Sequence, residues 1–136
     1  MKIAIIRQKF VLYGGAEQFA DGFIHQLAES GHEVHIFANR WTPSHHKNIH
    51  HHFVATLNFN SFFRTLSFAR TVAKEIREEN FDIVQSHEKT WSQDVYRAGD
   101  GCHIKWLHQR GKQISPIKKL FLFLNPFHRL ILNLEK

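Results

Sequence analysis

The sequence has very little cysteine and no long hydrophobic run. Its one cysteine, Cys102, excludes an internal disulfide and is typical of proteins in a reducing cytosol. No apolar stretch is long enough to span a bilayer. The apolar residues 3–6 are too few for a secretory signal, and Arg7 and Lys9 follow them closely. From these absences we expect a cytoplasmic protein.

Acidic residues are nearly missing from the last quarter of the chain. Residues 1–103 contain eleven Lys or Arg and eleven Asp or Glu, whereas residues 104–136 contain seven basic residues and only Glu135. The net charge of +6 therefore arises in the C-terminal segment, which we expect to contact an anionic partner. Nucleic acid is disfavoured as that partner, because the sequence has neither a recognition-helix motif nor an RNP-like aromatic strand.

The composition is otherwise that of one folded domain. The chain has 136 residues, 43% of them hydrophobic and 13 of them phenylalanine, which is enough for a substantial core. We divide it into a core, residues 1–103, and a basic amphipathic helical segment, residues 104–136, of the same domain.

The first 38 residues predict a buried parallel strand–helix–strand unit. Apolar residues 3–6 and 34–38 are short enough for buried strands. Between them, one helical face carries the apolar residues Ala16, Phe19, Ala20, Phe23, Ile24, Leu27 and Ala28. Gly31 is placed to end this helix, because glycine adopts the left-handed conformation readily.

Gly14 and Gly15 stand at the turn from the first strand into this helix. A glycine pair there lets backbone N–H groups approach an anion, and the helix N-terminus adds partial positive charge. The pair can equally serve a tight turn alone. The dinucleotide fingerprint G-x-G-x-x-G is missing, which disfavours an ordinary NAD-binding domain.

The middle of the chain continues the alternation of strands and helices. We expect a third strand at residues 53–57 and a helix at 61–80, capped by Asn60 or Ser61. The apolar stripe of this helix consists of Phe62, Phe63, Leu66, Ala69, Val72, Ala73 and Ile76. Residues 82–86 and 95–98 are expected to be the fourth and fifth strands. This order predicts an α/β fold with a Rossmann-like, doubly wound, mostly parallel sheet.

A histidine-rich stretch precedes the third expected strand. It contains His45, His46, His50, His51 and His52. A metal site is one interpretation, but residues 39–52 contain no Cys, Asp or Glu to complete a fixed tetrahedral set. We therefore expect a solvated loop and no metal.

Three loops are expected at the carboxyl ends of the strands, where such sheets bind ligands. They contain Gly14 with Gly15, then His87 with Glu88 and Lys89, then Asp100 with His103. Each also has a purely structural interpretation. Asp100 can be a turn residue between two glycines, the histidines can be satisfied loop residues, and Glu88 can be a solvated charge.

The C-terminal segment predicts two amphipathic helices. Ser115 and Pro116 are typical of a helix start, and Asn125 and Pro126 interrupt the apolar pattern. The segment's basic and interfacial residues are Lys105, Trp106, Arg110, Lys112, Lys118, Lys119 and Arg129. Such helices suit the surface of an anionic membrane. Alternatively their apolar faces pack against the sheet or a partner domain.

These motifs together resemble the N-terminal domain of a GT-B glycosyltransferase of the family-4 type. The likeness rests on residues 14–17 (G-G-A-E), 31–34 (G-H-E-V), 81–84 (F-D-I-V) and 97–103. With the region 125–129 (N-P-F-H-R), it is strongest to the lipopolysaccharide core glucosyltransferases and covers nearly the whole chain.

The resemblance implies a function. Such enzymes transfer a sugar from a nucleotide-sugar donor to a glycan acceptor, usually with retention and without a metal. It implies that Gly14 and Gly15 approach the donor diphosphate and that Asp100, with His103 as a weaker candidate, lies near the reacting sugar. Glu17, together with residues 87–89, would line the acceptor cleft. The basic segment would dock on the inner leaflet, at the cytoplasmic face of the inner membrane.

One departure from the family pattern concerns the donor side. The second domain, with its E-x7-E motif, is missing from these residues, and residue 136 falls within what reads as a continuing helix. We therefore expect the acceptor-side half of a glycosyltransferase, inactive by itself. The alternative is a non-enzymatic module that binds anionic membrane or polysaccharide through its basic tail.

Overall fold

The structure is a computed structural model that describes residues 1–10, 15–42, 45–99 and 101–135. Its strands are β1 (Lys2–Ile6), β2 (Lys9–Phe10), β3 (Glu33–Ala38), β4 (Arg40–Trp41), β5 (Ile49–Phe53), β6 (Ile83–Ser86) and β7 (Val95–Tyr96). Its helices are α1 (Gly15–Glu29), α2 (Ser61–Glu78), α3 (His103–Lys112), α4 (Pro116–Leu124) and α5 (Pro126–Leu134).

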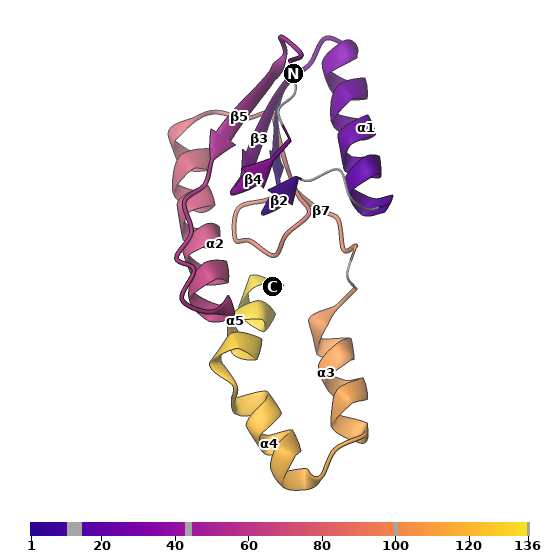
Figure 1. Cartoon of the computed structure of the whole chain (residues 1–136), viewed down its shortest axis with the longest axis vertical. Helices are drawn as coiled ribbons and strands as arrows, with labels where there is room; N and C mark the ends of the chain where they lie inside the picture. The colour runs from indigo at the N-terminus through magenta and orange to yellow at the C-terminus, as the bar shows by residue number, and fades with distance from the viewer. Residues whose placement is uncertain (11–14, 43–44, 100, 136) are drawn as a thin grey trace.

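Five parallel strands form the central sheet in the order β5-β3-β1-β6-β7. The strand at the centre is β1, and the chain winds outward from it in both directions. Helices α1 and α2 cover opposite faces of the sheet (Figure 1). The predicted doubly wound α/β fold is confirmed, and β2 and β4 add a small parallel pair beside it.

The core has two halves because successive strand residues face opposite sides of the sheet. On one side Ile3 and Ile5 pack with Ile24 of α1. On the other, Ala4 and Ile6 pack with residues of α2. The buried residues of α2 are Phe68, Ala69, Val72, Ala73 and Ile76. Both helices therefore hold the strands in a fixed register.

The ends of α1 and α2 follow the predicted signals. Gly31 has a φ of +85°, its N–H donates to the carbonyl of Ala28, and α1 ends there as expected. The side chain of Asn60 accepts a hydrogen bond from the N–H of Phe63 and caps α2. Two members of the predicted apolar faces are not buried, because Phe19 is 54% exposed and Phe63 is 43% exposed.

The predicted third strand was wrong in its boundaries. The strand is β5, which ends at Phe53, and three of the five histidines lie in it rather than in a solvated loop. It is an edge strand, where pairing with β3 fixes the backbone and side-chain polarity is a weak guide. His51 stacks on Trp41 with ring centroids 5.3 Å apart. Val54, just beyond β5, is fully buried on the α2 side.

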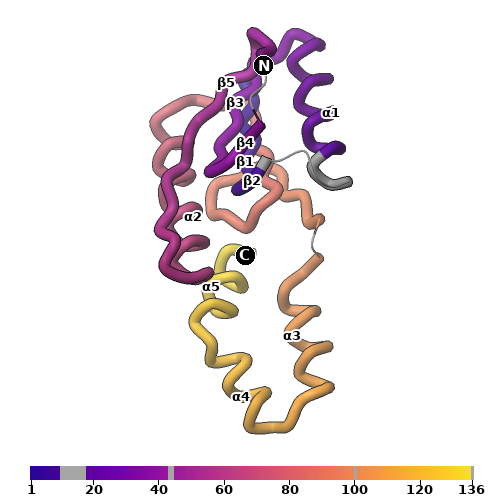
Figure 2. The backbone as a smooth tube through the Cα atoms, in the orientation of Figure 1, coloured from indigo at the N-terminus to yellow at the C-terminus, as the bar shows by residue number. Residues whose placement is uncertain are grey.

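Helices α3, α4 and α5 extend beyond the carboxyl end of the sheet. Figure 2 shows the chain running outward along α3 and returning along α4 and α5 to the edge of the sheet. The two helices predicted from Ser115 and from Asn125 are confirmed as α4 and α5. The helix α3 was not predicted, and His103, expected in a loop, is its first residue. Helix α5 ends at Leu134, with Glu135 as its C-cap.

Candidate functional site

A pocket of about 220 Å³ lies where the sheet meets α3 and α5. It is lined by His87, Glu88 and Lys89 from the segment after β6, and by His103 from the start of α3. The structure thus brings together four of the predicted site residues, from two of the three expected loops. They meet because parallel strands end at one edge of the sheet.

Glu88 is held at the junction of two strand ends. Its Oε1 accepts a hydrogen bond of 3.1 Å from the backbone N–H of Gln8, which follows β1. The backbone beside it is fixed by buried Ser86, whose hydroxyl donates to the carbonyl of Glu88 at 2.6 Å. These contacts hold the Glu88 carboxylate in the lining of the pocket, and an ionised carboxylate can accept hydrogen bonds from hydroxyl groups of a ligand.

Glu135 joins three elements around the pocket. Its Oε1 lies 2.9 Å from Nζ of Lys89 and accepts a 2.8 Å hydrogen bond from the backbone N–H of His103. Burial alone would raise the pKa of Glu135, but these two donors outweigh it and hold the pKa below its ordinary value. The carboxylate thus fixes Lys89 beside the first turn of α3.

His87 is neutral at pH 7. Burial, reinforced by the positive charges of Arg7 and Arg97, lowers the pKa of His87 to about 4. Its backbone N–H donates to the carbonyl of Ile6, and its Nε2 lies 3.0 Å from Nε2 of Gln85. Its Nδ1 is buried and has no hydrogen-bond partner within the described ranges. A neutral ring of this kind can position a ligand hydroxyl without adding charge.

A pair of histidines lies where α3 meets α5, and one of them, His103, lines the pocket. Nε2 of His103 lies 3.0 Å from Nδ1 of His128 on α5, and Trp106 stacks on the His103 ring. Burial is the main cause that lowers the pKa of both histidines, and the nearby Lys89 ammonium adds to the effect at His103. Both rings are therefore oriented by the fold and favour the neutral form at pH 7.

The remaining predicted site residues lie at or beyond the limits of the described structure. Gly15 begins α1, as predicted, whereas Gly14 and Asp100 are outside the described residues, as is the side chain of Glu17. One described contact joins α1 to the segment that follows β7. The guanidinium of Arg97 lies 4.2 Å from the ring centroid of Phe19, so the chain after β7 runs against the first turns of α1.

The predicted membrane-facing residues are spread over α3, α4 and α5. Lys105, Lys112 and Lys119 border a second pocket, of about 320 Å³, between α3 and α4. On α4 the apolar residues Ile117, Leu120, Phe121 and Leu124 are 56–70% exposed. Trp106, Arg110, Lys118 and Arg129 are also exposed. On α5, by contrast, Ile131 and Leu134 are buried. The packing alternative is therefore confirmed for α5, whereas membrane docking stays a prediction for α4, whose apolar face is exposed.

Sequence reasoning missed three residues that shape the pocket: Gln8, His128 and Glu135. Glu135 carried a signal, because it is the only acid among seven basic residues of the C-terminal segment. Such a charge is a natural partner for Lys89 once the helix returns to the sheet. Gln8 and His128 gave no comparable signal, since only the fold brings Gln8 to the pocket and His128 against His103.

A parallel α/β sheet with polar residues gathered at its carboxyl edge defines a Rossmann-like ligand-binding domain. The model of Glycosyltransferase Family 4 matches residues 13–135, and the chain belongs to this family. No curated protein matches the chain by sequence.

Among solved structures, the chain is similar to the crystal structure of WaaG, "a glycosyltransferase involved in lipopolysaccharide biosynthesis". The TM-score is 0.72 and the sequence identity is 22%. The match covers 79% of this chain and 29% of WaaG, so the chain spans less than a third of WaaG's length. The likeness confirms the predicted fold of a GT-B N-terminal domain. Within the described ranges, no helix combines the length and the apolar character needed to cross a bilayer.

Proposed function

We propose that this domain is the acceptor-side half of a retaining glycosyltransferase that uses a nucleotide-sugar donor without a metal. The observation that carries the proposal is the pocket at the carboxyl edge of the sheet, in a chain of glycosyltransferase family 4. In the reaction the acceptor hydroxyl gains the glycosyl group and the nucleoside diphosphate leaves. The acceptor is a lipopolysaccharide or another envelope glycan, as the likeness to WaaG suggests.

The proposal assigns the following roles to the residues. Gly15, the first residue of α1, and Gly14, which precedes it in the sequence, present backbone N–H groups to the donor diphosphate. Glu88 and Lys89 bind acceptor hydroxyls in the pocket, which His103 also lines. Asp100, three residues before His103, lies near the reacting sugar. Glu17 and His87 complete the acceptor cleft.

A GT-B reaction centre lies between two domains, and the second would bind the nucleotide and the donor sugar. The proposal therefore assigns catalysis to this domain only together with a donor-binding domain. Under this proposal, the domain alone does not catalyse glycosyl transfer.

The same proposal places the protein on the cytoplasmic face of the inner membrane. The exposed apolar face of α4 and the lysine-lined pocket beside it support contact with an anionic leaflet. They also favour a second candidate function, a non-enzymatic module that binds anionic membrane or polysaccharide through residues 104–136. The two differ in whether the protein consumes a nucleotide-sugar.

The experiment measures turnover of the protein assayed with its donor-binding domain. Asp100→Ala should lower turnover by roughly 10²-fold or more while circular dichroism stays unchanged, since a group at the reacting atoms typically contributes that much. The matched control is Glu29→Ala, at the exposed C-terminal end of α1. Near-normal turnover of the Asp100 variant would remove Asp100 from the mechanism. No turnover by the unaltered protein with any nucleotide-sugar would favour the non-enzymatic module.

A further inference from the structure

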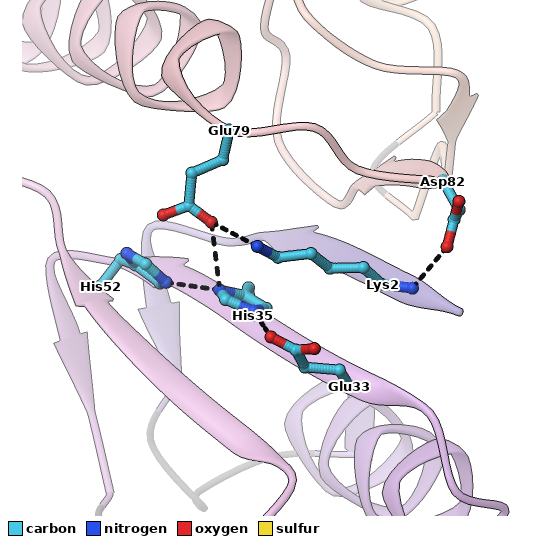
Figure 3. A network of polar contacts seen from close by, with 6 residues as sticks. All are labelled: Lys2, Glu33, His35, His52, Glu79 and Asp82. Atoms are coloured by element: carbon cyan, nitrogen blue, oxygen red, sulfur yellow. Dashed lines mark hydrogen bonds and ion pairs between the residues drawn. The ribbon is translucent and has the colours of Figure 1, made fainter.

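A cluster of ionisable side chains lies at the amino end of the sheet, on the α2 side and away from the pocket. Its centre is His35 of β3, which is only 6% exposed. Around it lie Glu33 of β3, His52 of β5, Glu79 after α2, and Lys2 of β1. Figure 3 shows the ring nitrogens of His35 and His52 facing each other, with the Glu79 carboxylate beside them.

The hydrogen bonds of His35 determine which of its nitrogens carries the proton. Nε2 lies 2.8 Å from Oε1 of Glu33, a carboxylate that only accepts hydrogen bonds when ionised. Nε2 of His35 therefore holds the proton, and Nδ1 presents a lone pair.

That lone pair faces another ring nitrogen. Nδ1 of His35 and Nε2 of His52 are 2.7 Å apart, and Oε2 of Glu79 is 3.8 Å from Nδ1. Two nitrogens at this distance require either a proton or a cation between them. An imidazole nitrogen that presents its lone pair is a common zinc ligand, and both rings can offer one here.

We propose that Nδ1 of His35, Nε2 of His52 and Oε2 of Glu79 bind a divalent metal ion of the zinc class. The three ligand atoms lie within 4.8 Å of one another, and water supplies the fourth position. Glu33 acts behind His35, where its hydrogen bond fixes the tautomer and orientation of the ligating ring, as carboxylates commonly do in zinc sites.

The cluster needs a small adjustment to accept the ion. Two nitrogens bound to tetrahedral zinc are about 3.3 Å apart, so the His35–His52 distance must widen by about 0.6 Å. His35 is enclosed in the sheet, whereas His52 lies on the edge strand β5 and is only half-buried. The movement therefore falls on the His52 ring, which can tilt toward the edge.

One group opposes the ion. Nζ of Lys2 lies 2.9 Å from Oε2 of Glu79, and its positive charge competes for the same oxygen. The backbone of Lys2 is held by a 2.6 Å hydrogen bond from its N–H to Asp82, but its side chain is partly exposed and can turn toward solvent. Removing this ammonium should strengthen metal binding.

The site would be structural rather than catalytic. The ion would tie β3 and β5 to the end of α2, at the opposite end of the sheet from the pocket. It takes no part in glycosyl transfer, so this inference is independent of the proposed function. Its expected effect is a higher melting temperature of the protein with zinc, because a ligand that binds only the folded state stabilises that state.

The experiment titrates the full chain with zinc in competition with a chromophoric chelator, and follows thermal unfolding in parallel. The unaltered protein should bind one equivalent and melt at a higher temperature with zinc. His52→Ala and Glu79→Gln should each weaken binding by at least tenfold, and Glu33→Gln by about 10- to 100-fold. His45→Ala, in the loop before β5, is the matched control and should bind as the unaltered protein does.

Two further variants keep the result decisive. Lys2→Met should bind zinc more tightly, an effect that misfolding cannot imitate. His50→Ala should leave binding unchanged, although His50, His35 and Glu33 form a second possible group on the other side of the ring. Three outcomes would overturn the proposal. The first is that His50→Ala loses zinc binding while His52→Ala and Glu79→Gln keep it. The others are that His52→Ala binds zinc as tightly as the unaltered protein, or that the unaltered protein does not bind one equivalent.

Discussion

Helices α4 and α5 have similar sequence patterns, but the structure buries the apolar face of α5 and leaves that of α4 exposed. Each has nine residues, each starts with a proline, and each carries an apolar stripe. Helix α5 buries Ile131 and Leu134 where it packs against α2, whereas none of the described residues of α4 is buried. An amphipathic pattern therefore predicts a helix and its apolar face, but not what that face contacts.

The difference follows from the route of the chain. Helix α5 returns to the carboxyl edge of the sheet, where Phe127 and Ile131 line the pocket and Asn133 accepts a hydrogen bond from Trp91. Helix α4 lies farther out, in contact with α3 and α5 (Figure 2). The apolar face of α4 is exposed, and under the proposed function it would contact an anionic membrane, a partner that its flanking lysines would favour.

The largest expected effect is on the free energy of unfolding, when the same Leu→Ala substitution is made in the packed helix α5 and in the exposed helix α4. Leu134→Ala in α5 should lower the free energy of unfolding by about 2–5 kcal/mol, because Leu134 is 2% exposed and its loss leaves a cavity. Leu120→Ala in α4 should change it by less than about 0.5 kcal/mol, because Leu120 is 60% exposed. Denaturant unfolding measures both.

If Leu134→Ala does not fold, a gentler pair gives the same comparison. Ile131→Val should cost about 0.5–1.5 kcal/mol, and Ile117→Val, at a position 70% exposed, should cost almost nothing. Equal losses at the two positions of either pair would show that α4 is packed in solution and would remove the contrast.

A smaller effect is expected at the membrane. Replacing Lys118 and Lys119 with Glu should weaken binding to anionic vesicles about tenfold or more, since each basic residue near such a surface contributes about 1 kcal/mol. Co-sedimentation with phosphatidylglycerol vesicles measures it, and binding should fall with added salt. Lys74→Glu with Arg77→Glu on α2 makes the same charge change away from this face and should bind normally. Unchanged binding by the α4 variant would mean that its basic face serves another partner.

The smallest effect concerns the Glu135 contact that joins α5 to the pocket. The pKa of Glu135 in the fold is below its ordinary value of 4.5, so the contact stabilises the protein above that pH and is lost as the pH falls through the lowered pKa. Glu135→Gln should remove this acid transition and destabilise the protein by less than about 1 kcal/mol.

The amide resonance of His103, which donates to Glu135, reports this titration by NMR. In the unaltered protein it should shift below pH 4.5, whereas in Glu135→Gln that shift should be missing. The neighbouring groups are Lys89, His103 and His128, and the two histidines also gain protons as the pH falls. An identical acid shift in both proteins would assign the transition to these histidines.

Much of the fold could be predicted because its signals are local. The apolar run of β1, the periodicity of α1, the positive φ at Gly31 and the Asn60 cap each depend on neighbouring residues alone. The boundaries of β5 could not be predicted, because His50, His51 and His52 belong to a strand only through pairing with β3. Local polarity argued for a loop, and the backbone hydrogen bonds of the sheet outweighed it.

The two sites divide in the same way. The order of strands predicted that residues 87–89 and His103 would come to one edge, and the pocket confirms it. The histidine cluster could not be foreseen, because residues 39–52 contain no acid and the carboxylates come from Glu33 and Glu79. These carboxylates are far from the histidines of this stretch in the sequence, and only the fold brings their ligand atoms within 4.8 Å of one another.

The sequence by itself determined the alternation of strands and helices, the family, and the basic character of the C-terminal segment. Each of these depends only on residue type and on spacing along the chain, and both can be read from the sequence. Tertiary structure alone decided that α5 is buried and α4 exposed, that Glu135 holds Lys89, and that His35 faces His52. These outcomes depend on which distant segments meet, and a linear pattern carries no information about the chain's route between them.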